Sequence, residues 1–167
     1  MLKAVQMIGA IGFILCLILM NRMEHRVKAV EPSFRTLDMR FHYSSEEMET
    51  TISDIKEEGR RAYGWFLSID YGFIACFLIV MLTVSGAVFT LPIIRNVFFA
   101  VCVCRAVFDI VENTMLLALL RAYPSFYQPL GAVCPWVTTL KFIMLYAWLL
   151  AVVIQLVVHG LHITRPA

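Results

Sequence analysis

Four long apolar stretches dominate this sequence, over residues 4–20, 65–89, 97–120 and 137–158. A helix needs about 20 apolar residues to cross the hydrocarbon core of a bilayer, and about 17 is near the lower limit. The chain has 167 residues, of which 60% are apolar and 16% charged, and a soluble fold of this size would leave much of that apolar surface in water. The pattern predicts an all-α integral membrane four-helix bundle, with residues 1–167 forming a single membrane domain.

Residues 21–62 form the only long polar stretch, with nine of the twelve carboxylates and eight of the fourteen Lys and Arg residues. Within it, Ser44 and Glu47 have the spacing of a capping box, in which each side chain satisfies a backbone N–H at the start of a helix. Apolar residues then follow at helical spacing. We therefore expect an extramembrane loop with an amphipathic helix over about 45–61, which lies on the membrane surface or leads into the next span.

The cations near the ends of the spans predict an orientation. Four spans place both termini on one side of the membrane, and place the long loop on the other side together with the 121–136 loop. More Lys and Arg residues flank these two loops than flank the opposite span ends, and loops rich in such cations face the cytosol. The long loop is therefore predicted to be cytosolic, with the termini on the opposite side. The aromatic belt typical of a headgroup boundary is expected at the loop side, from Tyr63, Trp65, Tyr123, Tyr127 and Trp136.

Several classes of function lack support in the composition. The net charge is only +2 and no basic stripe is interleaved with aromatics, so no nucleic-acid partner is predicted. The five cysteines form neither a CxxC motif nor a Cys/His pair at zinc spacing, and no Glu-x-x-His motif of a dimetal carboxylate site is present. We predict no metal and no cofactor. The expected partner is membrane lipid, and a homo-oligomer or a larger membrane complex stays open.

Outside the long polar stretch, every remaining carboxylate lies within an apolar stretch: Asp70, Asp109 and Glu112. Two cations, Arg105 and Lys141, lie within such stretches as well. A charge at the middle of a bilayer costs about 2.5–3.5 kcal/mol on insertion scales, so these side chains need partners or a polar cavity.

Four polar residues of the third stretch recur at i, i+4, i+7 and i+8: Arg105, Asp109, Glu112 and Asn113. On a helix they occupy one arc of about 100°, which we expect to face inward. By their positions along the spans, all the intramembrane polar groups fall in the half of the bilayer next to the long loop. The sequence predicts a polar pocket that opens toward this loop and is lined by Asp70, Asp109, Glu112, Asn113 and Lys141.

Three carboxylates against two cations leave one negative charge unbalanced, which is a condition for a general acid, a proton relay or a cation site. We predict that Asp109 or Glu112 acts as the acid or base, and that Lys141 stabilises a developing anion. Substrate-binding roles are predicted for the other polar groups of this region: Asp70, Asn113, Arg105, Arg60 and Tyr63.

An ordered set of short motifs resembles that of a family of small four-span membrane proteins. The motifs are Phe41-His42-Tyr43-Ser44-Ser45-Glu46-Glu47, Gly59-Arg60-x-x-Tyr63, Asp70, Phe108-Asp109-x-x-Glu112-Asn113, Tyr123-Pro124 and Thr138-x-x-Lys141. The likeness covers roughly residues 37–150, and it departs from the pattern with His42 in place of Gly and with Cys134 and Pro135. The family has no settled activity, so the resemblance implies the four-span fold and this set of residues without implying a reaction.

Three functions are compatible with the sequence. The first is a membrane-embedded enzyme or binding protein for a lipid-like or isoprenoid substrate, which uses acid/base chemistry. The second is a structural or accessory subunit of a membrane complex, in which the charges are packing pairs. The third is a proton-coupled transporter, although no pair of broken helices of the transporter type is present. Whether the protein is an enzyme stays open at this point.

Overall fold

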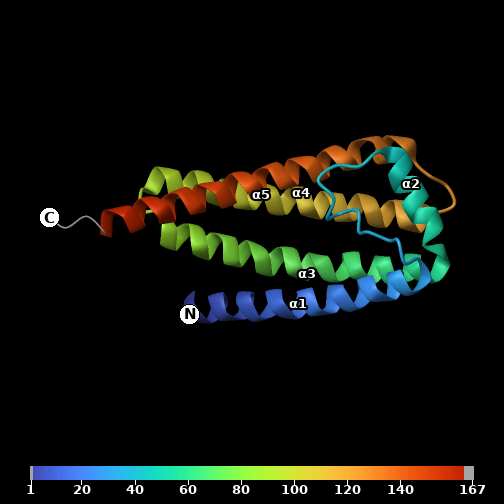
Figure 1. Ribbon diagram of the computed structural model, residues 1–167, viewed down its shortest axis with the longest axis horizontal. Coiled ribbons are helices and arrows are strands. Elements are labelled where there is room, and N and C mark those ends of the chain that lie inside the picture. The colour runs from blue at the N-terminus through green and yellow to red at the C-terminus, as the bar shows by residue number, and fades with distance from the viewer. Residues whose placement is uncertain (1, 164–167) are drawn as a thin grey trace.

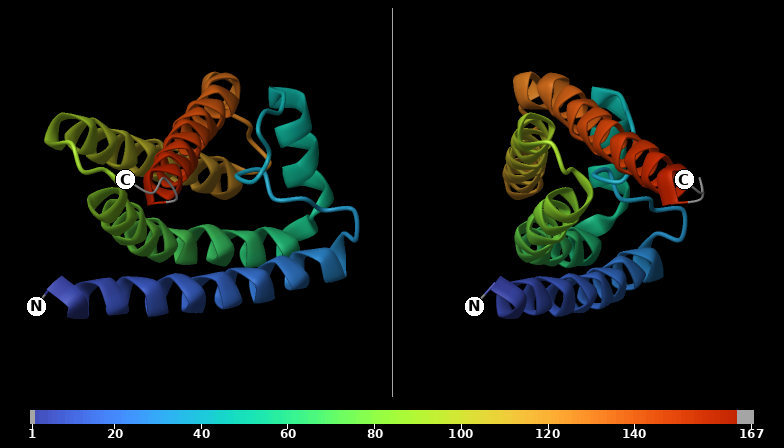
Figure 2. Two further views of the ribbon diagram at one scale, coloured as in Figure 1. Left: turned by 60° about the vertical axis from the view of Figure 1, so that its left-hand side comes forward. Right: turned by 90° about the vertical axis from the view of Figure 1, so that its left-hand side faces the viewer.

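The regular structure is helical throughout residues 2–163, the part of the chain that the computed structural model describes (Figure 1). Four long helices run side by side, and one short helix crosses an end of the bundle (Figures 1 and 2). The bounds are α1 Leu2–Val30, α2 Ser45–Asp54, α3 Lys56–Val88, α4 Pro92–Ala122 and α5 Gln128–Ile163. The predicted all-α class and helical bundle are confirmed.

Three helices are long and apolar enough to cross a membrane, over Lys3–Val30, Lys56–Val88 and Gln128–His159. They also expose large apolar side chains such as Ile8 and Leu150, as lipid-facing helices do. These features indicate a multi-pass membrane protein. The remaining long helix, α4, has 31 residues and packs against α3 and α5, but it carries several charged side chains in its middle.

The helices extend further than the predicted spans. Helix α1 continues past residue 20 to Val30, and its last turns carry an ion pair between Glu24 and Lys28. Helix α5 begins at Gln128 with Pro129 in its first turn, where a missing N–H is tolerated, and it also contains Pro135. The non-helical part of the predicted 121–136 loop is therefore only 123–127. Polar residues and prolines mark where a chain leaves the apolar region, which is not where its helix has to end.

The residues of the predicted helix over 45–61 are helical except for Ile55, but they divide between two helices, α2 and the first turns of α3. The capping box at its start is present, with Glu47 N donating to Ser44 Oγ at 3.0 Å and Ser44 N donating to the Glu47 side chain at 2.7 Å. However, α2 ends at Asp54, and Lys56 adopts a positive φ of 51° before α3 continues. The break lets α2 cross the bundle end and bury Met48 and Ile52, which one straight helix in line with α3 could not do.

The segment 31–44 between α1 and α2, which we call the strap, runs over the side of the bundle and is fastened to α5 (Figures 1 and 2). The side chain of Thr139 donates to the carbonyl of Phe41 at 3.1 Å and lies 3.0 Å from Nδ1 of His42. The hydroxyl of Tyr43 lies 3.2 Å from that of Thr138. The strap also buries Leu37 completely, so it is a packed part of the bundle.

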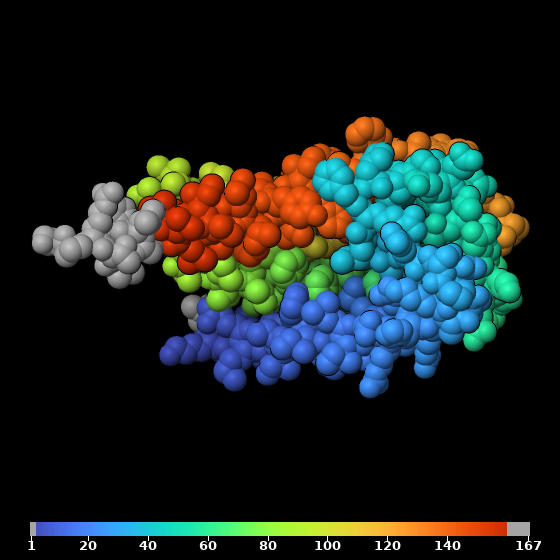
Figure 3. Space-filling model, in the orientation of Figure 1, coloured from blue at the N-terminus to red at the C-terminus, as the bar shows by residue number. Residues whose placement is uncertain are grey.

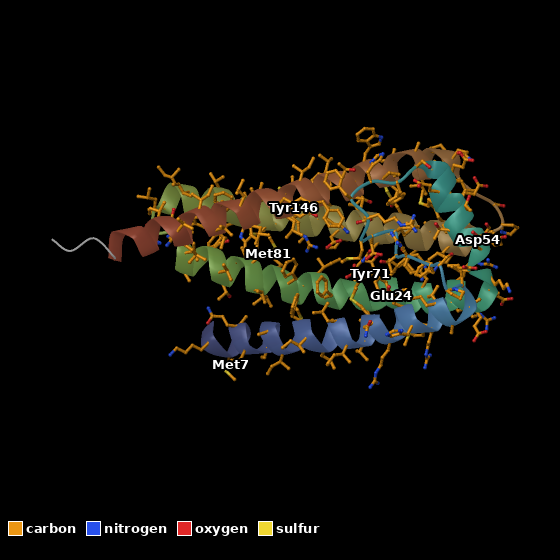
Figure 4. The ribbon with its side chains drawn as sticks, in the orientation of Figure 1. Met7, Glu24, Asp54, Tyr71, Met81 and Tyr146 are labelled. Atoms are coloured by element: carbon orange, nitrogen blue, oxygen red, sulfur yellow. The ribbon has the colours of Figure 1, made fainter. Side chains whose placement is uncertain are left out.

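The interior has two separate cores along the bundle axis. The loop-side core, next to α2 and the strap, centres on buried residues such as Leu37, Tyr63 and Leu116. The terminal-side core lies toward the opposite end, and consists of Met81, Phe89, Cys102, Trp148 and Val152. Figure 4 shows Met81 in the terminal half and Tyr71 and Glu24 closer to the strap. The charges that the sequence predicts to lie within the membrane are in the half that holds the loop-side core.

Candidate functional site

Helix α4 turns its polar arc into the bundle. The exposed fractions are 5% for Arg105, 2% for Asp109, and 0% for both Glu112 and Asn113. The neighbouring helices α3 and α5 cover this face. The spacing i, i+4, i+7, i+8 therefore translates into a continuous buried polar surface.

A chain of ion pairs links α4 to α5. The guanidinium of Arg105 lies 2.6 Å from Asp109 Oδ2, and Lys141 Nζ lies 3.0 Å from Asp109 Oδ1. The same ammonium lies 2.5 Å from Glu112 Oε2, and Thr138 Oγ1 donates to Glu112 Oε1 at 2.6 Å. Such pairs compensate the desolvation of buried charges only when their geometry is good and the remaining oxygens are hydrogen-bonded.

Asp70 of α3 belongs to the same region but lacks a cationic partner in the part of the chain that the structure describes. Its side chain is 3% exposed, and Oδ2 accepts a hydrogen bond of 2.6 Å from the amide of Asn113. This bond ties α3 to α4 beside the ion pairs. The region therefore holds more carboxylates than cations.

The strap supplies a further carboxylate, Asp38, which is 3% exposed. The hydroxyl of Tyr63 donates to Asp38 Oδ1 at 3.3 Å, and Lys141 Nζ donates to the backbone carbonyl of Asp38 at 2.8 Å. Burial raises the pKa of the Asp38 carboxyl to about 7, although nearby Lys141 opposes the shift, and the acidic Glu112 and Asp109 add to it. Asp38 therefore titrates close to neutral pH.

A cavity of about 240 Å³ lies between the strap, α1, α3, α4 and α5. Its polar wall consists of Asp38, Asp70, Arg105, Asp109 and Lys141. Its apolar wall includes Leu17 and Met20 of α1 and Phe66 and Phe73 of α3, while Asn21 and Glu24 lie where α1 leaves the apolar run. The cavity is thus amphiphilic: one side is charged and the other is hydrocarbon and aromatic.

Arg105 is the cation in this wall with unused hydrogen-bonding capacity. Its Nε and Nη1 are buried and have no hydrogen-bond partner among the residues that the structure describes. Its guanidinium lies over the ring of Phe77 at 4.8 Å, which leaves those N–H groups without an acceptor. A buried donor without an acceptor is costly, so this corner of the cavity favours a ligand oxygen.

The structure brings most of the predicted site residues together. Asp70, Arg105, Asp109 and Lys141 line the cavity, whereas Glu112 and Asn113 lie directly behind them. Tyr63 does not line the cavity but contacts two residues that do, Asp38 and Phe66. It is fully buried, so its placement in the predicted aromatic belt is wrong.

Arg60 does not belong to this cavity. Its guanidinium lies 3.9 Å above the ring of Tyr123 and donates to the carbonyl of Ile52 at 3.3 Å, on a different face of α3. The prediction grouped Arg60 with the polar residues of this region. Arg60 and Tyr63 are three residues apart, only about 60° around a helix, yet Tyr63 donates to Asp38 of the strap whereas Arg60 turns to Tyr123 and Ile52.

Within the described residues, no group of three or more His, Cys, Asp or Glu side chains has the geometry to hold a metal ion. No family model, curated protein or solved structure matches this chain.

Proposed function

We propose that the chain crosses the membrane four times, with α4 as the third span, and that its buried cavity takes the polar head of a lipid-like or isoprenoid amphiphile. The pairing of the α4 charges with one another and with Lys141 supports the crossing, because it reduces the cost of placing them in hydrocarbon. The long loop then faces the cytosol and both termini lie on the opposite side. The observation that carries the ligand proposal is the buried Arg105, with unpartnered N–H donors in a cavity that also has an apolar wall.

We place the entry route of the ligand along the surface of α3, between α1 and α5. Figure 3 shows α3 at the surface between α1 and α5 along one face of the bundle, up to the place where the strap covers it. Leu17 and Met20 on the cavity wall belong to α1, and Phe73 belongs to α3. The apolar tail of the ligand can therefore lie over α3, in the groove between α1 and α5, and lead from the surrounding lipid to the cavity.

The cavity volume limits what enters it. Pockets for whole drug-sized ligands are about 300–1,000 Å³, so a cavity of about 240 Å³ accommodates a head of a few heavy atoms and leaves the tail outside. The head has to offer an acceptor oxygen to Arg105 and a donor to Asp70. A neutral head with hydroxyl groups meets both requirements, because a hydroxyl both accepts and donates, and it adds no charge to a site that already holds several.

The chemistry would be proton transfer at this head. Asp109 and Lys141 reach the cavity, where Lys141 stabilises negative charge that develops on a ligand oxygen. Asp38 also lines the cavity and, since it is protonated below about pH 7, can donate a proton to the head. Glu112 contacts Lys141 and Thr138 behind the wall, so we assign it a positioning role for the ammonium.

The experiment is lipid analysis of the purified protein. The full chain is extracted in mild detergent, and the lipids that stay bound are identified by mass spectrometry after matched washing. We expect one amphiphile class to be enriched with the wild type and depleted at least about tenfold in Asp70→Asn and Arg105→Lys, which corresponds to 1.4 kcal/mol or more. Ser85→Ala, in the terminal-side core, is the control and retains the ligand. Equal retention in all four proteins would contradict the proposal.

A second test separates binding from catalysis. Glu112→Gln keeps the shape of the side chain and removes its charge, which weakens the hold on Lys141. If the protein is an enzyme, the variant retains a species that differs in structure, by mass or by fragmentation pattern, from the one bound to the wild type. Identical species in both proteins would leave a binding function only.

The structural or accessory subunit is the second candidate, because the ion-pair chain is complete: both Arg105 and Lys141 contact carboxylates. Buried ion pairs that serve packing alone can be replaced by apolar residues of similar volume without loss. A variant with apolar residues in place of all four ion-pair residues (Arg105, Asp109, Glu112 and Lys141) would then support cells as the wild type does. The amphiphile proposal predicts that this variant fails to do so.

A further inference from the structure

A second hollow lies outside the bundle, at the loop-side ends of α3 and α4. It has a volume of about 740 Å³, and we call it the α3–α4 groove. Its residues come from the first turns of α3, the last turns of α4 and the segment at Tyr123-Pro124. None of them lines the buried cavity, so the two hollows are separate.

The rim of the groove is strongly cationic. Arg60, Arg61 and Arg121 line it, against a single carboxylate from Glu57. That carboxylate pairs with Arg61 at 2.6 Å, and both side chains are largely exposed, at 73% and 78%, so the pair is weak and exchangeable. The guanidinium of Arg60 is held in place by its stacking on Tyr123 and its bond to the carbonyl of Ile52.

The floor of the groove is apolar and open. Leu117 and Leu120 of α4 line it, and Trp65 of α3 is 66% exposed at its edge. A Cβ atom built at Gly64 would meet no heavy atom within 4 Å, so the glycine leaves free space between the two helices. An exposed tryptophan beside arginines at one end of a long apolar helix is typical of the depth of lipid headgroups.

We propose that the α3–α4 groove binds one anionic phospholipid, whose phosphate lies between Arg61 and Arg121 and whose acyl chain runs over Gly64 and Leu117. Charge complementarity selects the anion, since three guanidinium groups face one carboxylate that is already paired. Guanidinium groups recognise phosphate oxygens through paired N–H donors. The apolar floor selects a lipid rather than a free phosphate. Arg60 contributes charge, while its own contacts keep the rim fixed.

This site is independent of the amphiphile cavity in residues and in ligand charge. It accounts for Arg60, which the cavity does not use, and for the exposed Trp65. It also fits the proposed orientation, because anionic lipids are concentrated in the cytosolic leaflet and attract basic segments there.

The test measures lipid preference of the full chain in mixed micelles of phosphatidylglycerol and phosphatidylcholine, by native mass spectrometry. We expect the wild type to retain phosphatidylglycerol selectively, and Arg61→Gln with Arg121→Gln to lower this preference at least about tenfold. The matched control is Arg22→Gln with Arg26→Gln. It removes the same charge from exposed positions on α1, at the same end of the bundle as the groove. It leaves the preference unchanged.

A substitution that keeps every charge gives a second measurement. Gly64→Leu fills the open floor and is expected to abolish selective retention, although the arginines remain. Replacing Arg61 and Arg121 by lysine keeps part of the preference and shows that the fold tolerates changes there. Glycerol phosphate, added as a soluble competitor, does not displace the lipid.

Two results would overturn the proposal. The first is an equal loss of preference in the groove variant and the α1 control, which would assign the effect to general surface charge. The second is undiminished selective retention in Gly64→Leu, which would exclude the groove as the place where the chain of the lipid lies.

Discussion

The two halves of the bundle are built from the same helices but stabilised differently. In the terminal half, the polar contact between α3 and α5 is neutral: Trp148 Nε1 donates to Ser85 Oγ at 2.8 Å, within a core of Met81, Phe89 and Cys102. In the loop half, α4 meets α5 through buried ion pairs and meets α3 through a carboxylate–amide bond. The terminal-side core thus combines apolar packing with neutral polar contacts, from Ser85 to Trp148 and to Cys102.

The buried ion pairs are therefore a feature of the loop half, and the terminal-side core consists of residues that carry no charge. They coincide with the cavity, the strap and the unpartnered N–H groups of Arg105, and none of these features is part of the terminal-side core. Costly groups concentrated in one half of a bundle favour a function for that half. The predictions below test this contrast from the largest effect to the smallest.

The largest effect is expected for Lys141→Met, which leaves Asp109 and Glu112 buried without the shared cation. Removing one partner of a buried ion pair costs about 3–5 kcal/mol of folding free energy. The change in folding free energy is measured by unfolding the protein in mild detergent and monitoring the loss of its helical circular dichroism. A loss below about 1 kcal/mol would mean that these carboxylates are neutral or hydrated in the folded protein.

Met81→Ala creates a cavity in the terminal-side core, where the side chain is fully buried. A substitution of this kind costs about 2–5 kcal/mol. If the halves have separate roles, the bound amphiphile is retained at temperatures where the variant is still folded. The lipid analysis described above measures this, and a loss of ligand as large as in Asp70→Asn would remove the distinction between the halves.

Asp38 makes the loop half sensitive to pH. Burial raises the pKa of its carboxyl in the folded protein from 3.8 to about 7, so the folded state keeps a proton that the unfolded state loses over this range. Stability from this group is therefore complete below 3.8, falls as the pH rises, and levels off above about 7. Retention of a ligand that accepts this proton falls roughly tenfold between about pH 6 and pH 8. Both trends are expected to vanish in Asp38→Asn, and their persistence there would assign the titration to another group.

The smallest effect is expected for Ser85→Ala, which removes the acceptor for the indole of Trp148. The net contribution of such a neutral hydrogen bond is about 1 kcal/mol. Unfolding in detergent measures it next to Lys141→Met. An effect equal to that of Lys141→Met would show that the neutral contact of the terminal half is as important as the ion pairs.

The helical class, the long apolar helices and the inward face of α4 follow from the sequence because each obeys a strong local rule. Charges within apolar runs have to find one another, so Asp70, Asn113, Glu112 and Lys141 could be grouped from their positions alone. The third crossing and the roles of these residues remain predictions.

Other features depend on tertiary packing and have no such signal. Asp38 lies in a polar stretch with eight other carboxylates, and only the course of the strap over the cavity distinguishes it. The break at Ile55 and Lys56 occurs without Gly or Pro, because burying Met48 and Ile52 across the bundle end outweighs a continuous helix. Arg60 was assigned to the cavity because it lies three residues before Tyr63, but its long side chain turns to Tyr123 and Ile52 instead.

The most direct measurement is an experimental structure of the protein in a lipid environment, at a resolution that separates lipid density from side chains. The account predicts elongated density in the groove between α1 and α5, with its polar end within hydrogen-bonding distance of Arg105 Nε or Nη1. A cavity closed by its own side chains, with Arg105 fully paired within the protein and lipid only on the outer faces, would contradict it.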